Sequence, residues 1–243
     1  MASFLLALQF LTIIPVKVKY IDEKLISKSM VYFPIIGLLL GLILAGSDKL
    51  LYFFNLDAFA INTILVILLI ALTGGMHLDG LADTADAFLS RKNKEGMLDI
   101  MRDSHIGVMG VLSLISIILL KIALFSSVNV LSRPMALLLM CVLSRWSAVW
   151  AMFLFPYARQ DGKAKVFIQG MNLKIFMLSL IAALIFAFVI WRIKGLFVLL
   201  IIAGCTYLSS RIISRKIGGI TGDTLGSTIE VMEIVTLFTV CIG

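Results

Sequence analysis

Three aspartates with helical spacing are the residues in this sequence best suited to chemistry. Asp79, Asp83 and Asp86 stand at i, i+4 and i+7 within the stretch 74–110. At about 100° per residue, these offsets place the three carboxylates on one face of a helix. Like charges one turn apart repel each other, so the arrangement is costly unless a cation lies among them. The spacing therefore favours a divalent-metal site, and the alternative is a solvated acidic helix face.

A second acidic pair follows in the same stretch. Asp99 and Asp103 are four residues apart in MLDIMRDSHIG, with Arg102 beside them and Gly107 ending the segment. Residues at this spacing share a helical face. The pair can therefore add carboxylates to the first group.

A third acidic group lies near the end of the chain. Asp223 follows a glycine-rich turn, and Glu230 and Glu233 come soon after it in an otherwise apolar run. Ionisable residues at membrane depth are expensive and are functional candidates. Two interpretations stay open: the acids complete a metal site or bind a nucleotide, or they pair with buried bases such as Lys121 and Arg145.

Composition indicates the class of protein that must position these groups. Hydrophobic residues make up 61% of the 243 residues and charged residues 14%, whereas a soluble domain carries about a quarter charged residues. We therefore expect an all-α, polytopic membrane helical bundle that forms a single integral membrane domain, residues 1–243, with 74–110 as its catalytic acidic segment. The three cysteines lie apart in apolar runs, which indicates neither a disulfide nor a zinc site.

Apolar runs define the expected membrane helices, about six to eight in number. The opening run, 2–16, is short for a span of about 20 residues, and we expect it to be interfacial or re-entrant. The others are 30–46, 58–73, 107–127, 134–155, 175–191, 195–208 and 225–241.

The basic residues predict the orientation of the bundle. Four loops, 17–28, 91–102, 159–174 and 211–216, carry 15 of the 21 lysines and arginines. Loops rich in Lys and Arg remain in the cytoplasm. We therefore expect a multi-pass protein of the cytoplasmic membrane with its acidic site facing the cytoplasm and an anionic substrate. The net charge of +7 follows from topology and does not indicate nucleic-acid binding.

Two blocks carry a family resemblance: HLDGLADTADAF (77–88) and IMRDSHIGVMGV (100–111). They resemble the signature of the cobalamin synthase family, the adenosylcobinamide-GDP ribazoletransferases of vitamin B12 assembly. FLTIIPV (10–16), FPIIGLLLG (33–41), FPYAR (155–159) and GGITGDTLGSTIEVME (218–233) extend the likeness over nearly the whole chain. His105 is a departure, because many members have arginine there.

The resemblance implies a Mg²⁺-dependent reaction, with Mn²⁺ as the other candidate metal. Adenosylcobinamide-GDP would donate its cobinamide phosphate to a ribose hydroxyl of α-ribazole, or of α-ribazole 5′-phosphate, and release GMP. Hard carboxylate oxygens suit these metals better than zinc. The aspartate pattern also resembles that of CDP-alcohol phosphotransferases, which makes a homodimer plausible.

Roles for individual residues follow as hypotheses. Asp79, Asp83 and Asp103 are expected to bind the metal, and Asp86 to be either a further ligand or the general base. A carboxylate beside other carboxylates has a raised proton affinity, which suits a base. Asp86, Asp83 and His77 form the expected catalytic group, with His77 contacting phosphate. The expected substrate-binding residues are Arg102, His105, Arg145, Asp223, Glu230 and Glu233.

Two other functions are compatible with parts of the acidic pattern. A phospholipid-making CDP-alcohol phosphotransferase would use similar carboxylates, but Asp83 and Thr84 stand where that family's Ala-Arg pair is expected. A divalent-cation channel or transporter would place its acids at mid-span. The lipid phosphotransferase is therefore the alternative, and the transporter ranks below it.

Overall fold

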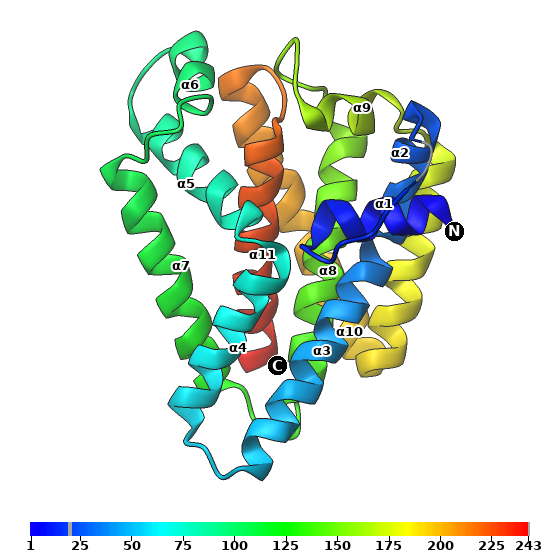
Figure 1. Cartoon of the computed structure of the whole chain (residues 1–243), viewed down its shortest axis with the longest axis vertical. Coiled ribbons are helices and arrows are strands. Elements are labelled where there is room, and N and C mark those ends of the chain that lie inside the picture. Colours follow the sequence, from blue (N-terminus) through cyan, green and yellow to red (C-terminus); the bar gives the residue numbers. More distant parts are fainter. Residues whose placement is uncertain (19–20, 243) are drawn as a thin grey trace.

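The computed structural model describes residues 1–18 and 21–242, which fold into helices joined by short loops (Figure 1). Within these residues there is no β-strand, only an isolated bridge between Tyr157 and Ile220. The helices are α1 Ala2–Leu11, α2 Glu23–Ser29, the 3₁₀ turn η1 Met30–Tyr32, α3 Phe33–Phe53, α4 Ala58–Thr73, α5 Met76–Leu89, α6 Lys94–Ile100, α7 Val108–Ser127, α8 Arg133–Leu154, α9 Lys163–Gln169, α10 Leu173–Ile217 and α11 Gly222–Ile242.

The predicted polytopic helical bundle is confirmed. Five described helical segments are long and apolar enough to cross a membrane, or six if α4 and α5 count as one bent span. The segment of α2, η1 and α3 counts as one of the five. With ten residues, α1 is too short to cross, and it lies across the neighbouring helices (Figure 1).

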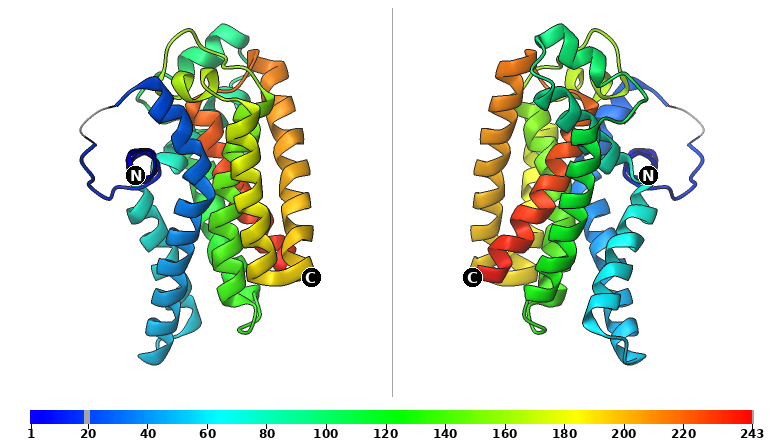
Figure 2. Two further views of the ribbon diagram at one scale, coloured as in Figure 1. Left: turned by 90° about the vertical axis from the view of Figure 1, so that its right-hand side faces the viewer. Right: turned by 90° about the vertical axis from the view of Figure 1, so that its left-hand side faces the viewer.

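The long helix α10 is a hairpin. Trp191 and Arg192 leave the helical conformation, and the two arms on either side run next to each other (Figure 2). Gly195 fits against the backbone carbonyl of Ala187, where a larger side chain would collide. The predicted break is therefore confirmed, but the second arm continues to Ile217, well past the predicted end. Basic residues in its last turn interact favourably with the helix dipole, which supports this extension.

Helix α8 forms the centre of the bundle and is buried along most of its length. Its closest neighbour is α3, which presents Gly37 and Gly41 to it. A Cβ at Gly37 would collide with the carbonyl oxygen of Cys141, and one at Gly41 would lie 2.8 Å from the Cα of Leu138. Small residues let membrane helices approach closely enough for dispersion contacts to hold them together.

A buried arginine ties four helices at the end of the bundle opposite α6 and α9. Arg133, at the start of α8, donates from Nε to Asp48 of α3 at 2.7 Å and from Nη1 to the carbonyl of Phe125 in α7 at 2.8 Å. Its Nη2 donates to Asn62 of α4. Because the guanidinium is paired and hydrogen-bonded, its burial is tolerated.

A double glycine sets the direction of the acidic helix. Gly74 and Gly75 have φ of 64° and 68°, a left-handed conformation that glycine adopts without steric cost. They end α4 and turn the chain by 92° into α5. This bend directs α5 between α7 and α11, and α5 packs against both helices (Figure 1).

Candidate active site

The three aspartates predicted to share a helix all lie on α5. Two glycines allow α5 to pack closely on α11. A Cβ at Gly80 would lie 2.6 Å from the backbone oxygen of Asp223, and one at Gly226 would lie 3.2 Å from the backbone of His77. The backbone of Asp223 therefore lies directly beside the acidic part of α5.

Four carboxylates influence one another at this junction. The negative charges of Asp79, Asp223 and Asp86 all repel that of Asp83. Among the described charged groups that act on Asp83, Arg159 is the one that attracts it. The side chains of Asp79 and Asp83 form no hydrogen bond or ion pair within the described residues. Asp79 is exposed and Asp83 is half-buried. The junction therefore has negative charge available for a cation.

Arg159 completes this group, although no role was predicted for it. The loop after α8 pairs with the loop before α11: the N–H of Ala158 donates to the carbonyl of Ile220, and the N–H of Ile220 donates to the carbonyl of Pro156, both at 2.9 Å. This pairing brings Nη2 of Arg159 to 2.6 Å from Oδ2 of Asp223. The Nε of Arg159 is buried and has no hydrogen-bond partner among the described residues. The FPYAR motif, an arginine directly after a span, was the available signal.

Asp86 has a different environment from the other two aspartates of α5. Its Oδ2 accepts from the N–H of Gly107 at 2.7 Å, and its Oδ1 accepts from the N–H of Gly110 at 2.8 Å. The carboxylate therefore caps the amino end of α7, where unpaired N–H groups and the helix dipole favour a negative charge. Both oxygens are engaged by the protein, so the structure does not present Asp86 as a free ligand or base.

Arg102, Asp103 and His105 lie in the exposed loop between α6 and α7. Oδ1 of Asp103 lies 2.6 Å from Nδ1 of His105. This hydrogen bond lowers the pKa of Asp103 and raises that of His105. The structure records no contact between Asp103 and Asp79 or Asp83, so it does not bring the four predicted ligands together. The charge of Arg102 does reach Tyr157, whose pKa is raised by burial.

The two glutamates of α11 belong to a buried ion cluster. Nζ of Lys121 on α7 lies 2.6 Å from Oε2 of Glu230 and 2.5 Å from Oε2 of Glu233. Arg145 on α8 also pairs with Glu233. Of the two interpretations left open by the sequence, pairing with buried bases is confirmed. Two positive and two negative charges balance one another and link α7, α8 and α11.

His77 borders this cluster from α5. Its side chain is 4% exposed, and the charges of Arg145, Glu233 and Lys121 all act on it. Its Nδ1 has no hydrogen-bond partner within the described residues. His77 and Arg145 therefore lie beneath the carboxylate group, in the interior of the bundle.

The described residues contain no group of three or more acidic, histidine or cysteine side chains arranged to hold a metal ion. The donors at hand nevertheless fit magnesium. Mg²⁺ is commonly held by one or two carboxylates, with water and substrate phosphates completing its shell. Asp79 and Asp83 supply two such carboxylates, one helical turn apart and without hydrogen-bond or ion-pair partners among residues 1–18 and 21–242.

The fold and the site together define a polytopic membrane protein with carboxylates and an arginine gathered at one end of a helical bundle. The chain matches the family described as Cobalamin-5-phosphate synthase over residues 3–241. It belongs to this family, and the resemblance predicted from the motifs is confirmed.

Curated relatives agree with the family assignment. The chain is 34% identical to the adenosylcobinamide-GDP ribazoletransferase of Desulforamulus reducens, over 100% of this chain and 97% of the relative. It is 39% identical to the Roseiflexus sp. enzyme of the same name, over 98% of this chain and 88% of the relative. It is 36% identical to the Escherichia coli enzyme, over 95% of both chains. No solved structure matches the chain.

Proposed function

We propose that this protein transfers the cobinamide phosphate of adenosylcobinamide-GDP to a ribose hydroxyl of α-ribazole or α-ribazole 5′-phosphate. The ribose oxygen forms a bond to the phosphorus that carries cobinamide, and the hydroxyl proton is released to the solvent. The bond between that phosphorus and the bridging oxygen breaks, and GMP leaves with the bridging oxygen. The proposal takes its substrates from the names of the relatives, and its site from the carboxylates of α5.

One observation supports the site more than any other. Within the part of the chain that the structure describes, the side chains of Asp79 and Asp83 form no hydrogen bond or ion pair, and the Asp223–Arg159 pair lies at the same junction. A diphosphate substrate brings negative charge, so it needs both a cation bound by carboxylates and a positive side chain. This combination meets that need, whereas a purely structural acidic patch would have its charges paired.

Asp79 and Asp83 would hold Mg²⁺ together with the diphosphate. The bound metal would neutralise charge on the transferring phosphoryl group and on the leaving nucleotide. Arg159 would donate to phosphate oxygens from its partly engaged guanidinium, and Asp223 would orient it. Arg102 and His105, exposed on the loop nearby, would contact the nucleotide from the aqueous side. Asp103, as the hydrogen-bond partner of His105, would act through it.

The predicted residues in the buried cluster, and Asp86, would hold the surrounding helices in position. Glu230, Glu233, Lys121 and Arg145 would fix α7, α8 and α11 around the site by mutual neutralisation. Asp86 would hold the amino end of α7 in place. The residues of the buried cluster would thus have a structural role in place of the predicted substrate contact. Asp86 would have a structural role in place of metal binding or base catalysis.

The site would face the cytoplasm. Most basic residues fall in loops at the end of the bundle that holds the carboxylates, as expected for the cytoplasmic side. Single cysteines at Ser104 and Asn129, placed in a chain with Cys141, Cys205 and Cys241 replaced by alanine, test this. In intact cells an impermeant maleimide should label Asn129→Cys and spare Ser104→Cys; the reverse pattern would overturn the orientation.

The reaction is tested with purified protein in liposomes. Adenosylcobinamide-GDP is supplied with α-ribazole or its 5′-phosphate, and GMP and the corrinoid product are measured by mass spectrometry. Stoichiometric appearance of both products is expected. Absence of product from a folded protein, together with CMP release from a CDP-alcohol and an alcohol acceptor, would overturn the proposal in favour of a lipid phosphotransferase.

A further inference from the structure

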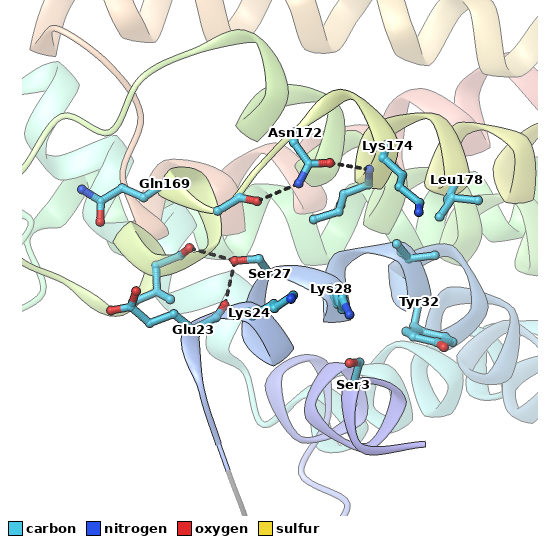
Figure 3. Close-up of a pocket in the computed structure, with 14 residues that line it drawn as sticks. Ser3, Glu23, Lys24, Ser27, Lys28, Tyr32, Gln169, Asn172, Lys174 and Leu178 are labelled. Carbon is cyan, nitrogen blue, oxygen red and sulfur yellow. Dashed lines mark hydrogen bonds between the residues drawn. The ribbon is translucent and has the colours of Figure 1, made fainter.

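A separate cavity of about 620 Å³ lies at the same end of the bundle as the acidic site. It opens between α2 and η1 on one side and α9 and the first arm of α10 on the other, with Ser3 of α1 at its edge (Figure 3). None of the carboxylates of the α5–α11 junction lines it. The cavity is therefore a different place from the proposed active site.

The cavity gathers positive charge. Lys24 and Lys28 stand one turn apart on α2, and Lys174 extends from α10 on the opposite side (Figure 3). Among the described residues of the lining, Glu23 is the one acidic residue, which leaves an excess of two positive charges there. Within residues 1–18 and 21–242, none of these three lysines forms an ion pair or hydrogen bond. Their charges are available to an anion.

Two uncharged polar side chains of the lining, Ser27 and Asn172, are already engaged by the protein. Ser27 donates to the carbonyl of Glu23 at 2.8 Å, and Oδ1 of Asn172 accepts from the N–H of Ile175 at 3.0 Å. Asn172 thus caps α10, and Lys174 sits in the first turn of that helix, which contains no acidic residue. A cation at the positive end of a helix dipole is unfavourable, and a bound anion would offset it.

The floor of the cavity is apolar and continues into the outer surface of the bundle. Val31, Ile175 and Leu178 line it, and Leu178 is 44% exposed. Further along the same face of α10, Ile181 and Ile185 are 47% and 54% exposed. A ligand here meets cations at one end and a hydrocarbon surface at the other.

We propose that this cavity binds an anionic phospholipid, with its phosphate among Lys24, Lys28 and Lys174 and an acyl chain along Ile175 and Leu178. Basic pockets between membrane helices commonly bind acidic lipid headgroups. A free phosphate or nucleotide would use the lysines but leave the apolar floor uncovered. The proposal rests on the multi-pass fold and not on the proposed reaction.

The test measures lipid binding to the delipidated full chain in detergent by native mass spectrometry. The lipids are phosphatidylglycerol and phosphatidylcholine with identical acyl chains, and glycerol 3-phosphate serves as a headgroup without chains. One variant combines Lys24→Gln, Lys28→Gln and Lys174→Gln. The matched control combines Lys17→Gln, Lys49→Gln and Lys92→Gln, three exposed lysines outside the cavity.

Phosphatidylglycerol should bind at least tenfold more tightly than phosphatidylcholine. The cavity variant should weaken phosphatidylglycerol binding by roughly 100-fold, and the control should keep it, since each lysine near a lipid surface contributes about 1 kcal/mol. Equal binding of both lipids, or equal loss in both variants, would overturn the proposal. Displacement of the lipid by equimolar glycerol 3-phosphate would instead make this a phosphate site.

Discussion

The carboxylate of Asp86 on α5 accepts a hydrogen bond from the backbone N–H of Gly107 at the amino end of α7, with Oδ2 2.7 Å from the nitrogen. A residue predicted to act on the substrate thus joins two helices of the framework. Gly107 and Gly110 leave just enough space for the carboxylate, because a Cβ on either would collide with its oxygens.

Replacing Gly110 by alanine should therefore separate Asp86 from α7. We expect the free energy of unfolding to fall by about 1–2 kcal/mol, the usual contribution of a helix cap. The melting temperature in detergent measures the effect. Gly46→Ala is the control, because a Cβ there meets nothing within 4 Å. Equal melting temperatures for the two variants would show that the cap contributes no stability.

Replacing Asp83 should remove activity and leave stability intact, in contrast to the replacement of Gly110. Since three neighbouring carboxylates repel its charge, Asp83→Asn should abolish GMP release while leaving the fold unchanged or stabilising it by a few tenths of a kcal/mol. Activity and melting temperature are measured on the same preparation. Asp99→Asn, on the exposed side of α6, should change neither. A clear loss of stability in Asp83→Asn would indicate a structural role.

The buried ion cluster predicts strong energetic coupling. Glu233→Gln leaves Arg145 and Lys121 with too little compensating charge and should destabilise the protein by about 3–5 kcal/mol. Adding Lys121→Met to Glu233→Gln should recover part of that loss, because one unpaired cation is removed. A double-mutant cycle from chemical denaturation measures the coupling. Additive losses would contradict mutual neutralisation within the cluster.

The exposed Asp103–His105 pair predicts a pH effect. The hydrogen bond and charge of Asp103 raise the pKa of His105 above its ordinary value of about 6.5. The stabilisation from His105 is therefore fully present below that value and is lost as pH rises through the raised pKa. NMR titration of the imidazole should show a midpoint that falls toward about 6.5 in Asp103→Asn. An unchanged midpoint in that variant, matching an Asp99→Asn control, would refute the pairing.

Much of the fold could be predicted because hydropathy and helical periodicity are properties of short, continuous segments of the sequence. The apolar runs located the spans, and the charged break near Arg192 predicted the α10 hairpin. The spacing of Asp79, Asp83 and Asp86 predicted one helix, and α5 confirms it.

The contacts between distant segments could not be predicted in the same way. A helical period identifies a face but not the element that packs on it. Asp86 meets α7 because the loop between α5 and α7 brings Gly107 back to it, and no pattern in the sequence specifies that path. Arg159 and Asp223 are 64 residues apart and meet through two paired loops. The sequence therefore predicted the acidic half of the candidate site but not its arginine.

The most direct test of the account is the Mg²⁺ dependence of GMP release in liposomes, measured for the unmodified protein and for Asp79→Asn. If Asp79 and Asp83 hold the metal, EDTA should abolish release and added Mg²⁺ should restore it. Asp79→Asn should lower turnover by at least about 100-fold at the same Mg²⁺ concentration, because several kcal/mol of charge stabilisation are lost. Release that persists in EDTA, or an Asp79→Asn variant with the unmodified Mg²⁺ dependence, would contradict the carboxylate-held metal site.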